Sequence, residues 1–158
     1  MRGPLPGVPP VLQPVAHSLL QSREEVERLL PALGADRLAA RPGGAASVAF
    51  HVRHAAGSLD RLLTYARGES LTPAQLETMA LENVDHPDNG ATLAALFGMA
   101  VERALTQVAG TDPTTVLDAR GVGRRQLPST VLGLLFHAAE HTQRHIGQAT
   151  TMARMTTG

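Results

Sequence analysis

The chain has 158 residues, balances its formal charges to zero and contains no cysteine. This length is typical of one domain with a sizeable core. The balanced charge, with no basic cluster, excludes an extended surface for nucleic acid or for an anionic membrane, and the absence of cysteine excludes disulfide bonds and thiolate metal ligands.

The first ten residues contain four prolines and predict a flexible N-terminal lead-in, residues 1–10, to a single domain over residues 11–156. They lack the continuous apolar run of a signal peptide. No later stretch approaches the ~20 apolar residues that a membrane-spanning helix needs. We therefore expect a cytoplasmic protein with no membrane partner and no nucleic-acid partner.

Apolar residues recur at helical spacing over residues 11–33, which predicts a first long helix. Gly34 and a following Pro-Gly-Gly cluster interrupt this pattern. Ser47 is then a candidate N-cap, and the apolar residues behind it predict a second long helix that runs to Arg67 and is ended by Gly68.

Thr72 at an N-cap position and Pro73 at the first helical position predict a short helix that ends at about Glu82. The next segment, residues 83–90, contains proline, asparagine and glycine and predicts a loop. His86 belongs to this loop and is expected at the surface.

Residues 91–108 carry an apolar stripe and predict a third long helix. Residues 111–127 contain β-branched residues and glycines, which favour an extended or hairpin-like connection. Pro128 or Ser129 then begins the last long helix, which runs to about Met155. Four long helices, one short extra helix and a long connection before the last helix predict an all-α protein, namely an antiparallel four-helix bundle.

Five of the seven histidines lie on two of these predicted helices: His51 and His54 on the second long helix, and His137, His141 and His145 on the last. Residues four apart on a helix are neighbours on one face, so two such histidines can bind one metal ion. All three on the last helix cannot do so, because the first and the third lie about 12 Å apart along the axis. The spacing predicts a metal site that combines a neighbouring pair with a ligand from elsewhere, and it leaves open which pair.

At these residues the chain resembles the DinB-like superfamily, which includes the YfiT-like proteins and thiol-dependent S-transferases. The resemblance rests on three segments: Ser-Val-Ala-Phe-His-Val-Arg-His-Ala-Ala-Gly-Ser-Leu-Asp-Arg-Leu (47–62), Val-Gly-Arg-Arg (122–125) and His-Ala-Ala-Glu-His-Thr-Gln-Arg-His-Ile-Gly-Gln (137–148). It implies a four-helix bundle of DinB-like type, often a homodimer, with a three-histidine site for a divalent metal. By position, the resemblance implies the ligands His54, His141 and His145, with His51 as the alternative from its helix.

Three neutral imidazoles leave a coordination position open, as catalytic zinc sites do. Zn²⁺ or Ni²⁺ suits such ligands, and Fe²⁺ or Mn²⁺ remains open. The resemblance implies a metal-dependent enzyme that activates a low-molecular-weight thiol for transfer to an electrophile, a small-molecule substrate. Two alternatives stay open: a hydrolase that uses metal-bound water, and a non-enzymatic, dimeric metal-binding or stress-response module. The pattern assigns no catalytic residue.

His51, His137 and Gln148 are candidates for the pocket or for positions beside the ligands, since Gln148 lies close enough along its helix to reach a ligating histidine. For His51 and His137 the alternative, which we expect, is an ordinary core or surface position. Glu140 points about 100° away from the histidine that follows it, and is expected at an exposed or intersubunit position. The pair Arg124–Arg125 either forms an exposed turn, which we expect, or binds an anionic substrate or cofactor.

Overall fold

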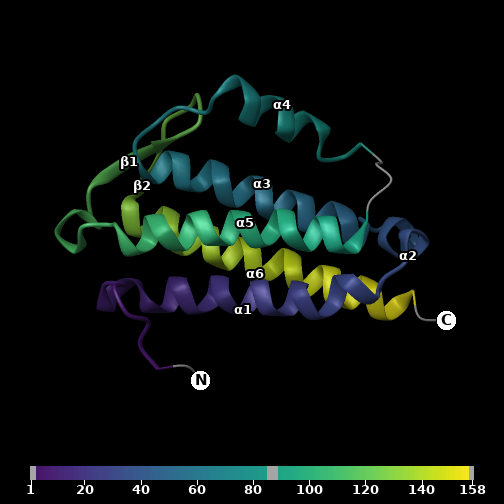
Figure 1. The fold of residues 1–158 in the computed structure, drawn as a ribbon. Coiled ribbons are helices and arrows are strands. Elements are labelled where there is room, and N and C mark those ends of the chain that lie inside the picture. The colour runs from purple at the N-terminus through teal and green to yellow at the C-terminus, as the bar shows by residue number, and fades with distance from the viewer. Residues whose placement is uncertain (1–2, 85–88, 157–158) are drawn as a thin grey trace.

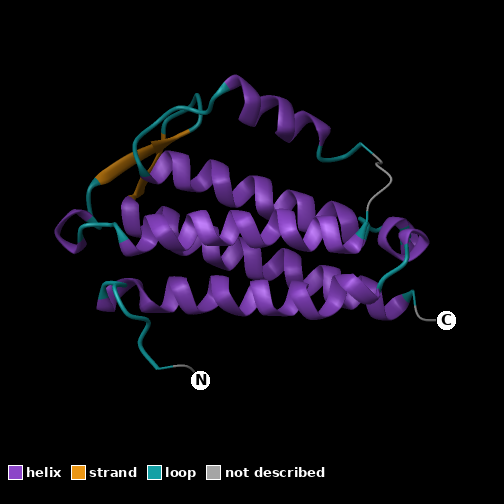
Figure 2. Ribbon diagram, viewed as in Figure 1, coloured by secondary structure: helices purple, strands orange, loops and turns teal. Residues whose placement is uncertain are grey.

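The computed structural model describes residues 3–84 and 89–156. These residues form a mostly helical structure with one small hairpin (Figures 1 and 2). The α-helices within the described ranges are α1 (Gln13–Leu29), α2 (Ala35–Ala39), α3 (Val48–Ala66), α4 (Pro73–Leu81), α5 (Gly90–Ala109) and α6 (Val131–Met155). The antiparallel hairpin consists of β1 (Ala119–Val122) and β2 (Leu127–Thr130). The predicted all-α class is confirmed, and so is the hairpin-like connection before the last helix.

Two differences from the predicted elements lie near the N-terminus. The helix predicted over residues 11–33 divides into α1 and flanking 3-10 turns at Pro10–Leu12 and Leu30–Ala32. Pro31 lacks the backbone N–H that would continue α1, which explains why the regular helix stops before it. The short helix α2 is an addition to the predicted set. The surface position expected for His86 lies outside the described residues.

The ends of α3 agree with the prediction, and this matters because α3 carries two histidines. The Ser47 side chain accepts a hydrogen bond from the backbone N–H of Phe50 at 3.2 Å, as an N-cap does. At the other end Gly68 adopts a left-handed conformation with φ of 80°. Backbone hydrogen bonds from Gly68 to Tyr65 and from Glu69 to Thr64 complete the helix stop.

The last helix begins later than predicted. Pro128 and Ser129, which were the expected starting residues, belong to strand β2 and pair with Gly121 and Arg120. A proline is tolerated on the edge of a two-stranded hairpin because no ladder hydrogen bond is needed there. Thr130 is the N-cap of α6, and its hydroxyl accepts a hydrogen bond from the Gly133 N–H at 3.0 Å.

The four long helices pack side by side, and α1 and α3 each lie against both α5 and α6 (Figure 1). Their inward faces supply the buried apolar residues, among which the largest side chains include Phe97, Leu59, Leu135 and Ile146. Within the described residues, no helix combines the length and apolarity needed to cross a membrane.

Some neighbouring helices are antiparallel and others are parallel. Helices α3 and α6 are antiparallel, because His51 lies beside His145 and His54 lies beside His141. Helices α3 and α5 run parallel, as do α1 and α6 (Figure 1). The predicted antiparallel arrangement is therefore wrong for these last two pairs. The physical reason is α4, which carries the chain back to the end of the molecule where α3 begins, so that α5 starts from the same end.

Two glycines of α5 allow a matched test of this packing. A Cβ on Gly90 would overlap the backbone carbonyl of Leu30, whereas a Cβ on Gly98 would meet no atom within 4 Å. We expect Gly90→Ala to lower the free energy of unfolding by roughly 1–3 kcal/mol through overpacking. Gly98→Ala should raise it by about 0.5–1 kcal/mol through reduced backbone entropy of the unfolded chain. Urea unfolding curves measure both, and equal effects would contradict the close approach of α5 to the end of α1.

Candidate metal centre

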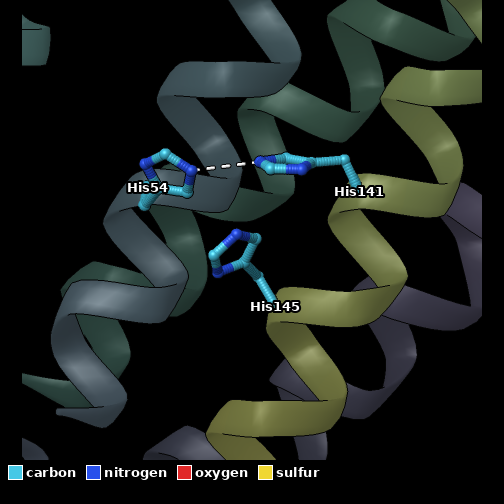
Figure 3. Close-up of side chains that lie close together, drawn as sticks. All are labelled: His54, His141 and His145. Atoms are coloured by element: carbon cyan, nitrogen blue, oxygen red, sulfur yellow. Dashed lines mark hydrogen bonds between the residues drawn. The ribbon is translucent and has the colours of Figure 1, made fainter. Parts of the chain in front are cut away.

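The structure brings three histidines from two helices together. His54 comes from α3, and His141 and His145 are one turn apart on α6 (Figure 3). Each offers a ring nitrogen, and these nitrogens lie within 4.8 Å of one another. The spacing left open whether His137 and His141 or His141 and His145 would face the other helix. The structure places His141 and His145 opposite His54 on α3.

The separations between the rings suit one shared metal ion. The Nε2 atoms of His54 and His141 are 3.0 Å apart, and the ring centroid of His145 lies 4.4 Å from that of His54 and 4.5 Å from that of His141. Two nitrogens bound tetrahedrally to one Zn²⁺ at 2.0–2.1 Å lie about 3.3 Å apart. The 3.0 Å between the two Nε2 atoms is close to this value, so the three rings could bind one ion with little movement. In the absence of an ion, the same distance suits a hydrogen bond from a protonated ring nitrogen to an unprotonated one.

Hydrogen bonds select which ring nitrogen of each histidine is available. The Nδ1 atom of His54 lies 2.7 Å from a carboxylate oxygen of Glu82, and the Nδ1 atom of His145 lies 3.0 Å from Nδ1 of His51. Both contacts leave Nε2 to face the centre of the group, and Figure 3 shows a ring nitrogen of His145 directed toward the other two rings. Metal-ligating histidines are commonly held in this way, through the nitrogen that does not bind the ion.

Glu82 is the functional residue that the sequence did not reveal. It follows the end of α4, is only 6 % exposed, and accepts a hydrogen bond from Arg61 Nη1 at 2.6 Å in addition to its contact with His54. Burial acts to raise the pKa of Glu82, but the hydrogen bonds from His54 and Arg61 outweigh it, so the pKa lies below its usual value. The side chain is therefore an ionised acceptor that orients the His54 ring.

Gly57 makes room for this carboxylate. A Cβ at position 57 would overlap Oε1 of Glu82 and would lie 2.8 Å from Nη1 of Arg61. Glycine inside a helix costs up to about 1 kcal/mol relative to alanine, so it needs a compensating reason such as this close approach. Gly57, one turn after His54, is the sequence feature that could have indicated a buried side chain packed against α3. The sequence did not indicate that this side chain belongs to Glu82.

The surroundings of His145, His141 and His51 favour the neutral form of each ring. Burial, followed by the nearby His54, His141 and His51, lowers the pKa of His145 to about 4. The pKa of His141 and that of His51 are also lowered, mainly by burial and next by His54. Neutral imidazole is the form that binds a metal ion, so at neutral pH these rings need not release a proton first.

The other residues considered in the sequence differ in their burial and in their distance from the three histidines. His51 is buried beside His145 but stands outside the group of three. The His137 side chain is 53 % exposed, with its Nδ1 atom 3.5 Å from a carboxylate oxygen of Glu140. Gln148 is exposed, and within the described parts of the chain it makes no hydrogen bond to the three histidines. Glu140 is partly exposed and pairs with the arginine one turn further along α6.

Phe50 forms an aromatic wall beside the group. Its ring stacks on that of His54, with centroids 5.5 Å apart and an angle of 13° between the planes. The same ring meets His51 edge-on at a centroid distance of 5.5 Å. Phe50 thus restricts the rotation of both α3 histidines and gives the site an apolar side.

Comparisons with known proteins agree with this architecture. A sequence model of the DinB superfamily matches residues 18–149, which include all three histidines. The fold is similar to a crystal structure of a conserved protein from Enterococcus faecalis, with 16 % identity, a TM-score of 0.68, and coverage of 91 % of this chain and 95 % of that one. It is also similar to a DinB-like protein from Bacillus cereus ATCC 10987, with 14 % identity, a TM-score of 0.65, and coverage of 89 % of each chain. At these identities the likeness concerns the fold alone. No match was found among curated proteins.

A pair of substitutions on one helix tests the choice of ligands. We expect His145→Ala to reduce the affinity for Zn²⁺ by a hundredfold or more, on the order of 3 kcal/mol, because it removes one of three ligands. His137 lies one turn before His141 and two turns before His145 on α6, outside the group of three. His137→Ala should therefore leave the affinity within about twofold of wild type. Competition with a chromogenic chelator measures both. A loss of affinity in His137→Ala alone would assign the site to the other pair.

The role of Glu82 is tested by removing its charge but not its shape. Glu82→Gln should lower the metal affinity by roughly 10–100-fold, the usual effect of losing the hydrogen-bond partner of a ligating histidine. Glu77→Gln provides the matched control, because Glu77 is an exposed acidic residue on α4, the short helix that Glu82 follows. If the two variants bound Zn²⁺ equally well in the chelator competition, Glu82 would have no part in the site.

Proposed function

The chain belongs to the DinB superfamily, and from this premise we propose that it is a metal-dependent enzyme acting on a small-molecule substrate. The observation that carries the proposal is the group formed by His54, His141 and His145. Within residues 3–84 and 89–156, no fourth histidine, aspartate or glutamate joins these three. Three protein ligands with an open position are typical of catalytic zinc sites, whereas structural zinc sites have four.

The reaction that we propose is the transfer of a low-molecular-weight thiol to an electrophile. A divalent ion at the three imidazoles supplies Lewis-acid chemistry, which favours the thiolate form of a bound thiol. In the overall reaction the thiol sulfur forms a bond to the electrophilic atom, the thiol proton is released, and the leaving group departs with the electron pair of the broken bond. Nitrogen ligands favour Zn²⁺ or Ni²⁺, with Fe²⁺ or Mn²⁺ as further candidates.

The residues around the ligands support such a role by holding the rings still. Glu82 fixes His54 through Nδ1, and His51 fixes His145 through the same type of ring atom. Arg61 balances the charge of Glu82. A preorganised ligand set loses less free energy on binding an ion than a mobile one. The homodimer and the cytoplasmic location remain parts of the proposal, and they follow from the resemblance and the sequence composition.

The first experiment determines whether the chain holds a metal. Elemental analysis of tag-free protein, wild type beside His54→Ala, should find near one equivalent of metal in the wild type and a loss of most of it in the variant. Metal-free wild type that also fails to bind Zn²⁺, Ni²⁺ or Mn²⁺ on titration would contradict the proposal and favour a non-enzymatic module.

The second experiment separates thiol chemistry from hydrolysis. Wild type loaded with Co²⁺ should develop a thiolate-to-metal charge-transfer absorption when a panel of low-molecular-weight thiols is added, and His54→Ala treated in the same way should not. Hydrolysis of activated esters that needs the metal but no thiol would instead favour the hydrolase. Metal binding with neither response would leave a metal-binding module as the function.

A further inference from the structure

A cavity lies at the other end of α3, away from the histidines. It has a volume of about 510 Å³ and is lined by residues from the end of α3, the segment leading into α4, and the β1–β2 hairpin. Cavities of roughly 300–1,000 Å³ are typical of small-molecule sites. Tyr65 lines it from α3, eleven residues after His54, which corresponds to about 16 Å along the helix axis. The cavity is thus separate from the candidate metal centre.

The charge inside this cavity is unbalanced. Arg120 and Arg124 line it, and so does one acidic residue, Glu69. Glu69 is already paired with Arg67, at 2.7 Å. Among the residues that the structure describes, no carboxylate pairs with Arg120 or Arg124. Two guanidinium groups beside a neutralised acid leave a net positive charge facing a concave surface, which favours an anionic ligand.

Arg120 is held in position by the backbone. Its Nε atom donates to the carbonyl of Ala66 at 2.9 Å, and its Nη1 atom donates to the carbonyl of Ala119, also at 2.9 Å. The Ala66 carbonyl belongs to the last turn of α3, where the helix dipole also favours a cation. Within the described residues the Nη2 atom makes no hydrogen bond, so a fixed donor remains available to a ligand.

The hairpin turn that carries Arg124 is also well defined. Gly123 and Gln126 have φ values of 66° and 47°, and the Gln126 side chain donates to the Gly123 carbonyl at 2.8 Å. A Cβ on Gly121 would overlap this side chain, so the turn closes tightly on itself. The Tyr65 hydroxyl lies 4.0 Å from the Cβ position of Gly123, and it has no hydrogen-bond partner among the described residues. A phenol donor therefore lines the same cavity as the two arginines.

We propose that this cavity binds a small organic anion. Its carboxylate or phosphate group would accept hydrogen bonds from Arg120 and Arg124, since guanidinium donors match the oxygens of both groups. Its body would lie on the Tyr65 ring and on Leu71 and Leu76, which supply the apolar part of the wall. This inference is independent of the metal, so it holds or fails without regard to the proposed enzyme activity.

Nuclear magnetic resonance on the full-length protein tests the binding directly. Phenyl phosphate, benzoate and inorganic phosphate serve as probes, and phenol serves as the uncharged control. We expect at least one of the anions to shift the backbone amide signals of Ser70, Gly121 and Gly123 in a saturable way, while phenol does not. If phenyl phosphate binds more strongly than benzoate, the cavity prefers a phosphate group, and the reverse order indicates a preference for a carboxylate. No saturation by any anion up to about 10 mM, the weak limit for a small-molecule site, would overturn the proposal.

Two adjacent arginines provide matched variants. Arg124→Gln should raise the dissociation constant of the preferred probe about tenfold, the loss expected for a charge-assisted hydrogen bond. Arg125→Gln makes the same charge change at the next position, which does not line the cavity, and should change the constant by no more than about twofold. Tyr65→Phe should weaken binding without any change in charge. If Arg124→Gln and Arg125→Gln raised the dissociation constant equally, the binding would reflect general electrostatic attraction, and this result would contradict a defined site.

Discussion

The buried carboxylate of Glu82 is the contact on which the geometry of the candidate metal centre depends. It joins the end of α4 to α3 by accepting hydrogen bonds from both His54 and Arg61. A charge that is 6 % exposed would be costly if unpaired, so both partners are needed to keep it there. Gly57 lets the carboxylate approach the helix. The two contacts of Glu82 therefore fix the orientation of the His54 ring and the position of a short helix at the same time.

Helix α4 shows why that contact matters for the fold as well. None of its residues is buried, so apolar packing gives it little stability. Its first turn is held by Gln75, whose side chain donates to Asp60 at 2.6 Å and to Thr64 at 2.8 Å. Its far end is held by Glu82. Because both anchors are polar contacts with α3, the path of α4 along α3 follows from hydrogen bonds, and this path places Glu82 level with His54.

Helix α3 supplies residues to both sites described above. Its first half carries His51 and His54, and its last turn carries Tyr65 and the Ala66 carbonyl that holds Arg120. The two sites differ in electrostatic character. The first gathers imidazole rings suited to a cation, and the second gathers guanidinium groups suited to an anion. Because α3 keeps the two sites about 16 Å apart, a cation at the first site and an anion at the second can each be bound by its own side chains.

The sequence by itself determined the features that depend on residues close in the chain. The cap at Ser47, the stop at Gly68, and the placing of five histidines on two helices follow from contacts between residues at most five apart. The spacing of the histidines left open which pair on α6 meets His54. The resemblance implied His141 and His145, and the packing of α3 against α6 brings these two to His54. Only the tertiary structure decided that two helix pairs run parallel and that Glu82 contacts His54. Along the sequence, His54 lies 28 positions from Glu82 and 87 positions from His141. These contacts arise from the packing of α3 against α6 and from the return path of α4, which no local pattern of side chains encodes.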